Sequence, residues 1–243
     1  SHICEESARA LGLTVTNTPG VLSECTADLT IMLMLMVARR AGEGERELRS
    51  GKWSGWAPTH MVGTKVSGKR LGIIGFGRIG QEVARRAHHG FGMNVVVYNR
   101  SAISSKALAE CGARQVDTLD ELIPQCDFLS LHCPGGSSNR HLGDAERLRL
   151  MNRDAYIINT ARGEVIDEFA LAEALEDGSI GGAALDVFEG EPIINASLLE
   201  CGKTVLLPHL GSATLETRQA MGFRVIENLD DFFEGREPRD RVI

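Results

Sequence analysis

From residue 69 onward, short apolar runs alternate with amphipathic stretches, and this alternation constrains the fold more than any other feature. The apolar runs, for example residues 94–99 and 155–159, are rich in Val and Ile, whereas stretches such as residues 78–91 have helical periodicity. Strands that are apolar throughout are typical of parallel sheets with helices on both faces. The sequence therefore predicts an α/β fold built on a doubly wound parallel sheet. The expected strands are 70–75, 94–99, 127–133, 155–159, 181–187 and 204–208, and the expected helices are 78–91, 104–112, 119–126, 144–151 and 167–178.

The two ends of the chain lack this alternation. Residues 13–17 are the strand candidate near the N-terminus, and residues 212–235 are predicted to form one long helix with Ser212 as its N-cap. The apolar run at residues 29–38 is too short to cross a bilayer and is interpreted as a buried helix face. The loop at residues 50–64 holds both tryptophans, and an exposed aromatic loop indicates a contact with a partner.

The charge of the chain limits its partners. The formal net charge at pH 7 is −7, which argues against nucleic acid or an anionic membrane as the main partner. The cysteines are scattered without a C-x-x-C pair, so the sequence predicts neither a metal site nor a disulfide framework. The scattered cysteines favour a reducing compartment, and with no signal peptide or membrane-spanning run seen in the sequence, a cytoplasmic location is expected.

The stretch GFGRIG, residues 75–80, is a G-x-G-x-x-G motif between a buried strand and an amphipathic helix. In that context the motif is typical of dinucleotide-binding domains of the Rossmann type. Gly75 and Gly77 permit a tight turn and the close approach of a pyrophosphate, and Gly80 permits close packing of the helix on the strand. The free N–H groups at the helix N-terminus bind the anion. A dinucleotide is therefore the expected cofactor.

The residues at the end of the next strand indicate which dinucleotide it is. NAD sites usually carry an Asp or Glu about 20 residues after the motif, which binds the ribose 2′-hydroxyl. Here Asn99, Arg100 and Ser101 occupy that place, so no carboxylate repels a 2′-phosphate and Arg100 can bind one. NADP(H) is therefore the predicted cofactor, with NAD(H) as the alternative.

Three further stretches place polar groups directly after predicted strands, namely NTARGEVIDE (159–168), ALDVFEGEP (184–192) and LLPHLGSAT (206–214). Open α/β sheets bind their ligands at these carboxyl ends of the strands. Together with the glycine motif and the stretches TNTPGVLSECTADL (16–29) and LHCP (131–134), they make the chain resemble the D-isomer-specific 2-hydroxyacid dehydrogenases over nearly its whole length.

The resemblance implies a role for each motif residue. Arg162 is implied to hold the substrate carboxylate and carbonyl, His209 to be the acid/base, and Glu191 to orient that histidine. The implied reaction is hydride transfer between NADP(H) and a small 2-oxo or 2-hydroxy acid of the glyoxylate or hydroxypyruvate type. Cofactor contacts are implied for Thr26, Arg78, Ile79, Pro134, Thr160, Ala161 and Asp186, the last near the nicotinamide amide.

The resemblance also implies a domain division and an assembly. Residues 25–213 correspond to the dinucleotide-binding domain. Residues 1–24 and 214–243 correspond to a remnant of a smaller substrate domain, and most of the N-terminal half of that domain is expected to be missing from this sequence. A homodimer is implied, with Trp53 and Trp56 in a loop that contacts the partner subunit.

Elementary chemistry favours the same residue types. Addition of hydride to a 2-oxo acid builds charge on the carbonyl oxygen, which requires a proton donor that titrates near neutral pH, as histidine does. A carboxylate beside the histidine favours its protonated form. The guanidinium of arginine stays charged and binds a carboxylate through two hydrogen bonds. Structural or surface roles are expected for the other histidines, at positions 2, 60, 88, 89, 132 and 141.

Two alternatives stay open at this point. One is another dehydrogenase branch, such as phosphoglycerate dehydrogenase; formate dehydrogenase is disfavoured, because that branch is expected to replace Glu191. The other is a dinucleotide-sensing interaction protein, like the corepressors that share this fold and retain the Arg, Glu and His. The sequence does not rank the small 2-oxo acids as substrates.

Overall fold

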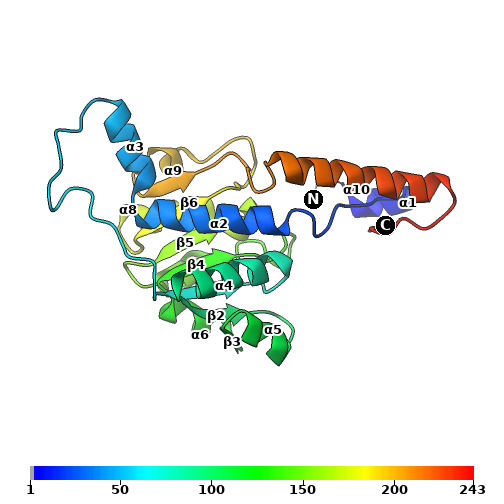
Figure 1. Cartoon of the computed structure of the whole chain (residues 1–243), viewed down its shortest axis with the longest axis horizontal. Coiled ribbons are helices and arrows are strands. Elements are labelled where there is room, and N and C mark those ends of the chain that lie inside the picture. Colours follow the sequence, from blue (N-terminus) through cyan, green and yellow to red (C-terminus); the bar gives the residue numbers. More distant parts are fainter. Residues whose placement is uncertain (1–2) are drawn as a thin grey trace.

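The structure, a computed structural model, describes residues 3–243 (Figure 1). Within these residues, seven strands form one parallel sheet in the order β3-β2-β1-β4-β5-β6-β7. The predicted doubly wound sheet is confirmed. The strands are β1 Arg70–Ile74, β2 Asn94–Tyr98, β3 Ala113–Val116, β4 Phe128–Leu131, β5 Tyr156–Asn159, β6 Gly182–Leu185 and β7 Thr204–Leu206.

Helices connect the strands and extend the chain at both ends. Pattern alone predicted α4 to the residue and α5, α7 and α8 within a few residues. The α-helices are α1 Glu5–Ala10, α2 Ser23–Ala38, α3 Ala41–Arg49, α4 Arg78–Phe91, α5 Ser105–Glu110, α6 Leu119–Leu122, α7 Ala145–Arg149, α8 Glu168–Glu176, α9 Ala196–Glu200 and α10 Leu215–Phe233, with short 3-10 turns η1 Ile123–Gln125 and η2 Gly163–Val165.

The order of the strands reverses between β1 and β4. The chain first adds β2 and β3 on one side of β1, and then crosses over so that β4 pairs with the other side of β1. In open parallel sheets, ligands bind in the crevice at such a reversal, beyond the carboxyl ends of the strands. The turns after β1 and β4 therefore face the expected cofactor site.

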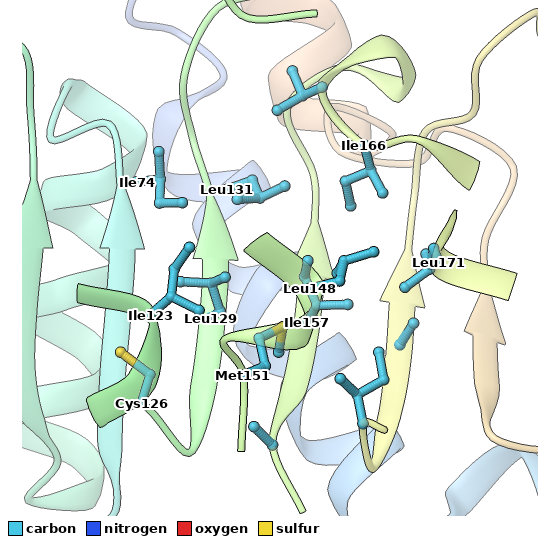
Figure 2. Close-up of a cluster of buried hydrophobic side chains, with 14 of the residues drawn as sticks. Ile74, Ile123, Cys126, Leu129, Leu131, Leu148, Met151, Ile157, Ile166 and Leu171 are labelled. Atoms are coloured by element: carbon cyan, nitrogen blue, oxygen red, sulfur yellow. The ribbon is translucent and has the colours of Figure 1, made fainter. Parts of the chain in front are cut away.

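Helices cover both faces of the sheet. On one face α2, α4 and α5 pack on strand residues such as Ile73 and Ile158. On the other face α6, α7 and α8 pack on residues such as Leu129 and Ile157 (Figure 2). Successive residues of a strand point to opposite faces, so strands covered on both sides must be apolar throughout. This requirement explains the runs of Val, Ile and Leu.

Helix α2 is buried along most of its length. Leu33, Met34 and Val37 are buried against the sheet face that also holds α4. Burial of one such side chain stabilises the fold by about 1.5–3 kcal/mol. The interpretation of residues 29–38 as a buried helix face is confirmed.

The terminal segments contact each other away from the sheet, where α10 extends from the body of the molecule (Figure 1). The expected strand at residues 13–17 is wrong, because this segment forms only an isolated bridge between Thr16 and Arg241. The N-cap of α10 is Thr214, whose hydroxyl accepts the Thr217 N–H, and not Ser212. The assignment of residues 1–24 and 214–243 to a remnant of a substrate domain stays a prediction.

Several helices and one strand with a weak apolar sequence pattern were not predicted. The edge strand β3 places one buried apolar side chain, Val116, on the sheet, so its sequence lacks an apolar run. Helices α1, α3 and α9 are short or polar and were not expected either. The loop at residues 50–64 has no helix or strand; it projects from the body in Figure 1 and exposes Trp53 and Trp56. No helix in the described part of the chain could span a membrane.

Candidate active site

Arg162 follows β5 in a tight turn that the buried Asn159 holds in place. The Asn159 side chain accepts the Ala161 N–H at 3.0 Å and donates to the Arg162 carbonyl at 2.9 Å. Asparagine commonly stabilises turns through such bonds to nearby backbone. Arg162 itself is exposed and lines a crevice of about 390 Å³ together with Gly77 and His132. The turn thus holds a guanidinium beside the predicted cofactor site.

Glu191 and His209 follow β6 and β7, and their side chains meet. Glu191 Oε2 lies 2.8 Å from His209 Nδ1. The other carboxylate oxygen, Oε1, accepts the Phe188 N–H at 2.9 Å. Because Nδ1 is hydrogen-bonded to Glu191 and the imidazole is about half exposed (47%), Nε2 is the ring nitrogen that can contact a substrate. The structure therefore brings this predicted pair together.

The charges around Glu191 favour its ionised form. Burial alone would raise the pKa of Glu191, but the hydrogen bonds from His209 and from the Phe188 N–H lower it. The positive charges of His209 and Arg162 lower it further, so the net pKa is below the ordinary value. Arg162 makes no hydrogen bond to Glu191 or His209 in the described residues, but its charge acts on the same carboxylate. The three residues thus form one electrostatic unit.

Asp186, the residue after β6, fixes the turn that carries His209. His209 has a left-handed φ of 56°, and its N–H donates to the Asp186 carbonyl at 2.9 Å. The Asp186 carboxylate accepts the N–H groups of Leu210 at 2.7 Å and of Gly211 at 2.8 Å. A left-handed residue other than glycine costs on the order of 1–3 kcal/mol, which these bonds offset. Burial raises the pKa of Asp186, while the two N–H groups oppose that rise.

The turn after β1 has room for a pyrophosphate. Gly75 has a φ of 93°, and a Cβ there would lie 2.8 Å from the carbonyl carbon and oxygen of His132. A Cβ on Gly80 would lie 2.3 Å from the Gly75 carbonyl oxygen, so α4 packs on this turn only through glycine. At Gly77, the N-cap of α4, a Cβ would meet open space. Free N–H groups at the start of α4 next to this space fit an anion.

Comparison with known families identifies the architecture. A sequence model described as "D-isomer specific 2-hydroxyacid dehydrogenase, NAD binding domain" matches residues 31–211. The chain belongs to this family. The matched residues include the glycine motif and the turns after β5, β6 and β7, so this part of the chain is the cofactor-binding domain of an NAD(P)-dependent dehydrogenase.

Individual members of the family are similar over most of the chain. A glyoxylate reductase from Thermococcus litoralis is 46% identical over 241 residues, which are 98% of this chain and 72% of the relative. A solved structure of a putative D-isomer-specific 2-hydroxyacid dehydrogenase from Polaromonas sp. JS6 66 is 38% identical with a TM-score of 0.94 and covers 100% of this chain and 75% of that one. An NADPH-dependent glyoxylate/hydroxypyruvate reductase from Sinorhizobium meliloti, solved in complex with NADP and malonate, is 35% identical with a TM-score of 0.90, covering 99% and 73%.

In this dehydrogenase, the residues predicted to select the cofactor lie at the end of β2. Asn99 Oδ1 accepts the Phe76 N–H at 3.2 Å, which ties the end of β2 to the glycine motif. Asn99 Nδ2 donates to both the carbonyl and the hydroxyl of Ser101, each at 3.0 Å. Arg100 is exposed and has no hydrogen bond or ion pair with any residue between 3 and 243. Its guanidinium is therefore free to bind an anion.

Two of the residues predicted to contact the cofactor also form hydrogen bonds within the protein. Thr26 Oγ1 donates to the Gly211 carbonyl at 2.9 Å, and Thr160 Oγ1 lies 2.8 Å from Thr30 Oγ1. Both threonines are buried. They join α2 to the turns that carry Arg162 and His209. A contact of either threonine with a cofactor stays a prediction.

The other residues predicted to contact the cofactor lie along the same edge of the sheet. Arg78 and Ile79 begin α4 and line the crevice with Arg162. Pro134 is exposed after β4, and Ala161 is buried in the turn after β5. Cofactor contacts for these residues likewise stay predictions.

The remaining histidines outside the pair make contacts within the protein. His132 Nε2 lies 2.8 Å from Ser130 Oγ, and burial lowers the pKa of His132 to about 3. His141 Nε2 lies 2.8 Å from Glu189 Oε2. His2 lies outside the described residues, and neighbouring carboxylate or carbonyl oxygens contact His60, His88 and His89.

Two residues that support the site had no predicted role. Asn159 is the last residue of a predicted strand, and the tendency of asparagine to bond to nearby turn backbone was a usable signal. Glu168 is buried beneath the loop that carries Glu191. Its position in the first turn of a helix is typical of a solvated acidic residue, so no sequence signal distinguished it.

Proposed function

We propose that this dehydrogenase uses NADP(H) to reduce a small 2-oxo acid of the glyoxylate or hydroxypyruvate type. The observation that carries the proposal is the 2.8 Å contact between Glu191 and His209, in a site where Arg162 supplies a positive charge. The names of the relatives support the substrate class, because the Thermococcus litoralis protein is a glyoxylate reductase and the Sinorhizobium meliloti protein a glyoxylate/hydroxypyruvate reductase.

Each of the three residues has a distinct role in this proposal. Arg162 binds the substrate carboxylate through its planar guanidinium and so orients the neighbouring carbonyl group. The nicotinamide supplies a hydride to the carbonyl carbon when it is bound. As the C=O electron pair moves onto oxygen, His209 donates its Nε2 proton there and the product is a 2-hydroxy acid. Glu191 holds the imidazole through Nδ1 and favours the protonated ring before that transfer.

The cofactor preference in this proposal depends on Arg100. A 2′-phosphate carries negative charge, and an exposed arginine without a protein partner is suited to bind it. Asn99 and Ser101 add no carboxylate, and their own hydrogen bonds keep the end of β2 in place beside Arg100. The NADP bound to the Sinorhizobium meliloti relative supports this preference.

We also propose that the protein is a homodimer through the loop at residues 50–64. Trp56 is 83% exposed, and Trp53 lines a mainly apolar groove of about 330 Å³ together with Leu48 and Met61. Exposed aromatic and aliphatic surface of this kind is typical of protein interfaces. Twofold pairing would cover the same loop on both subunits.

The test of the proposed activity is a direct assay. NADPH oxidation is followed at 340 nm with glyoxylate, hydroxypyruvate, pyruvate and phosphohydroxypyruvate, on the full-length protein that contains this sequence. We expect turnover with the first two acids. Preference for the phosphorylated acid would instead indicate the phosphoglycerate dehydrogenase branch. NADPH binding without turnover of any of the four acids would indicate a dinucleotide-sensing interaction protein.

A further inference from the structure

The loop that carries Glu191 rests on a buried carboxylate that the proposed reaction does not use. Glu168 begins α8 and is 6% exposed. Its Oε1 accepts the backbone N–H of Glu189 at 2.6 Å. A buried carboxylate is costly unless it is paired or hydrogen-bonded, so its placement under this loop calls for a physical reason.

The charges near Glu168 make this placement more costly. Burial is the largest effect and raises the pKa of Glu168, the backbone N–H groups of Glu189 and Asn195 oppose the rise, and the carboxylates of Glu189 and Glu191 add to it. An apolar side chain would fill the same space without this repulsion. The distinctive property of Glu168 is therefore its hydrogen-bond acceptor.

The two peptide groups on either side of Phe188 are held by several neighbouring groups. Glu168 accepts the N–H of the Phe188–Glu189 peptide, and Glu191 Oε1 accepts the N–H of the preceding Val187–Phe188 peptide. The turn after Arg162 closes a further side, because a Cβ on Gly163 would lie 1.9 Å from the Phe188 carbonyl carbon. These two adjacent peptide groups therefore link the Arg162 turn, Glu168 and the side chain of Glu191.

Glu189 is anchored at its side chain as well. Its carboxylate pairs with Arg140 at 2.5 Å and with His141 at 2.8 Å, both on the loop after β4. These pairs are partly exposed and contribute little each, on the order of 0–1 kcal/mol. The bond to Glu168 differs from these pairs because its acceptor belongs to a buried residue.

We propose that Glu168 is a positioning residue for Glu191. By accepting the Glu189 N–H, it fixes the peptide whose neighbouring N–H orients the Glu191 carboxylate toward His209. The inference rests on the proposed function of the Glu191–His209 pair. It extends that function to a residue that touches neither substrate nor cofactor.

Several charged groups surround the Glu191–His209 pair, so the test must separate the effect of the Glu168 charge from the effect of its hydrogen bond. His209, Arg162, Asp186 and Glu168 all act on Glu191 electrostatically. A substitution at Glu168 can therefore act through its charge or through its hydrogen bond. Glu168→Gln removes the charge and keeps an acceptor oxygen, whereas Glu168→Leu removes both. Glu168→Asp keeps the charge but shortens the side chain, so its carboxylate is withdrawn from the Glu189 N–H.

The experiment measures kcat/KM for glyoxylate reduction between pH 5 and 9. We expect Glu168→Leu and Glu168→Asp to lower kcat and kcat/KM about tenfold and to move the basic limb of the profile toward acid, which is also the direction expected for Glu191→Gln. Glu168→Gln should recover most of the activity. Glu173→Leu, at an exposed glutamate of the same helix, should leave the profile unchanged. NADPH affinity and Tm, measured in parallel, show whether each variant is folded.

Combination with Glu191→Gln decides whether Glu168 acts through Glu191. If it does, Glu168→Leu and Glu168→Asp should change kcat by less than about twofold in the Glu191→Gln background, because the orientation of that side chain no longer matters. Equal losses in both backgrounds, or an unmoved limb in the folded Glu168 variants, would overturn the proposal.

A readout without turnover separates this inference from the proposed function. The NMR signal of the His209 Cε1–H, recorded at one fixed pH, should shift in the same direction in Glu191→Gln and in Glu168→Asp. A response to Glu191→Gln alone overturns the role of Glu168 and leaves the pair intact. No response to Glu191→Gln shows that the proposed pair itself fails.

Discussion

The side chains of Glu191 and His209 meet through a contact of 2.8 Å between Oε2 and Nδ1, although they lie on the loops after two different strands. Adjacent parallel strands β6 and β7 bring these loops to the same edge of the sheet. The geometry leaves Nε2 of the imidazole for a reacting oxygen.

Glu191→Gln should move the basic limb of the reduction profile toward acid. The substitution keeps the size and a hydrogen-bonding group but removes the charge that favours the protonated imidazole. Burial raises the pKa of Glu191, but the hydrogen bonds from His209 and the Phe188 N–H and the charges of His209 and Arg162 lower it below the ordinary value. The measurement is kcat/KM for 2-oxo acid reduction from pH 5 to 9. An unmoved limb would show that another group controls the protonation of His209.

Two further variants separate the roles within the same site. His209→Ala should abolish the basic limb together with most of the rate, because the proton donor is lost. Arg162→Ala should chiefly raise KM and leave the limb in place, because it removes the substrate clamp and not the donor. A limb that moves in Arg162→Ala as far as in Glu191→Gln would contradict this division.

Arg100→Ala should weaken NADPH binding and leave NADH binding nearly unchanged. Loss of one charge-assisted contact with the 2′-phosphate costs about 1.5–3 kcal/mol, which is roughly ten- to a hundredfold in affinity. The measurement is Kd for both cofactors by fluorescence titration. Arg114→Ala is the matched control, because that exposed arginine lies on the edge strand β3 and pairs with Gln125. Equal losses for both cofactors would refute the assignment.

His132 should make the fold sensitive to mild acid. Burial lowers the pKa of His132 to about 3, whereas an unfolded histidine has a pKa of about 6.5. Between these values the unfolded chain binds a proton that the folded chain does not, so stability falls as pH falls below 6.5. From pH 7 to pH 5 this group contributes a loss of about 2 kcal/mol in the free energy of unfolding.

Urea unfolding at pH 7 and pH 5 checks this expectation. His132→Asn cannot take up the proton and should lose correspondingly less stability between the two pH values than the unsubstituted protein. His89→Asn, at an exposed histidine of α4, should show the full loss. If His132→Asn is as acid-sensitive as the control, the buried ring is not the cause.

Trp56→Ser should weaken the proposed dimer. The side chain of Trp56 is 83% exposed in the single chain, so its removal costs the monomer little, whereas a covered tryptophan is a frequent centre of binding energy. The measurement is mass by light scattering at micromolar concentration on the full-length protein. A monomeric mass for the unsubstituted protein would contradict the dimer directly.

The sequence by itself determined the sheet apart from its edge strand β3, and it determined the glycine motif at the start of α4. Strands buried on both faces must be apolar throughout, and the helices between them must be amphipathic, so β1, β2 and α4 were readable from local pattern. The glycine motif was readable for a similar reason, because the positive φ of Gly75 and the close approach at Gly80 are demands of the local backbone.

The tertiary structure alone decided how the side chains at that edge are used. The pairing of Glu191 with His209, the bonds of Asp186 to the turn at Leu210 and the burial of Glu168 all join segments that are distant in the chain. The edge strand β3 was missed because Val116 is its one buried side chain, so its sequence contains no apolar run. Local pattern reports which face of an element is buried, whereas the partner of a polar group depends on strand register and loop path, which only the folded chain defines.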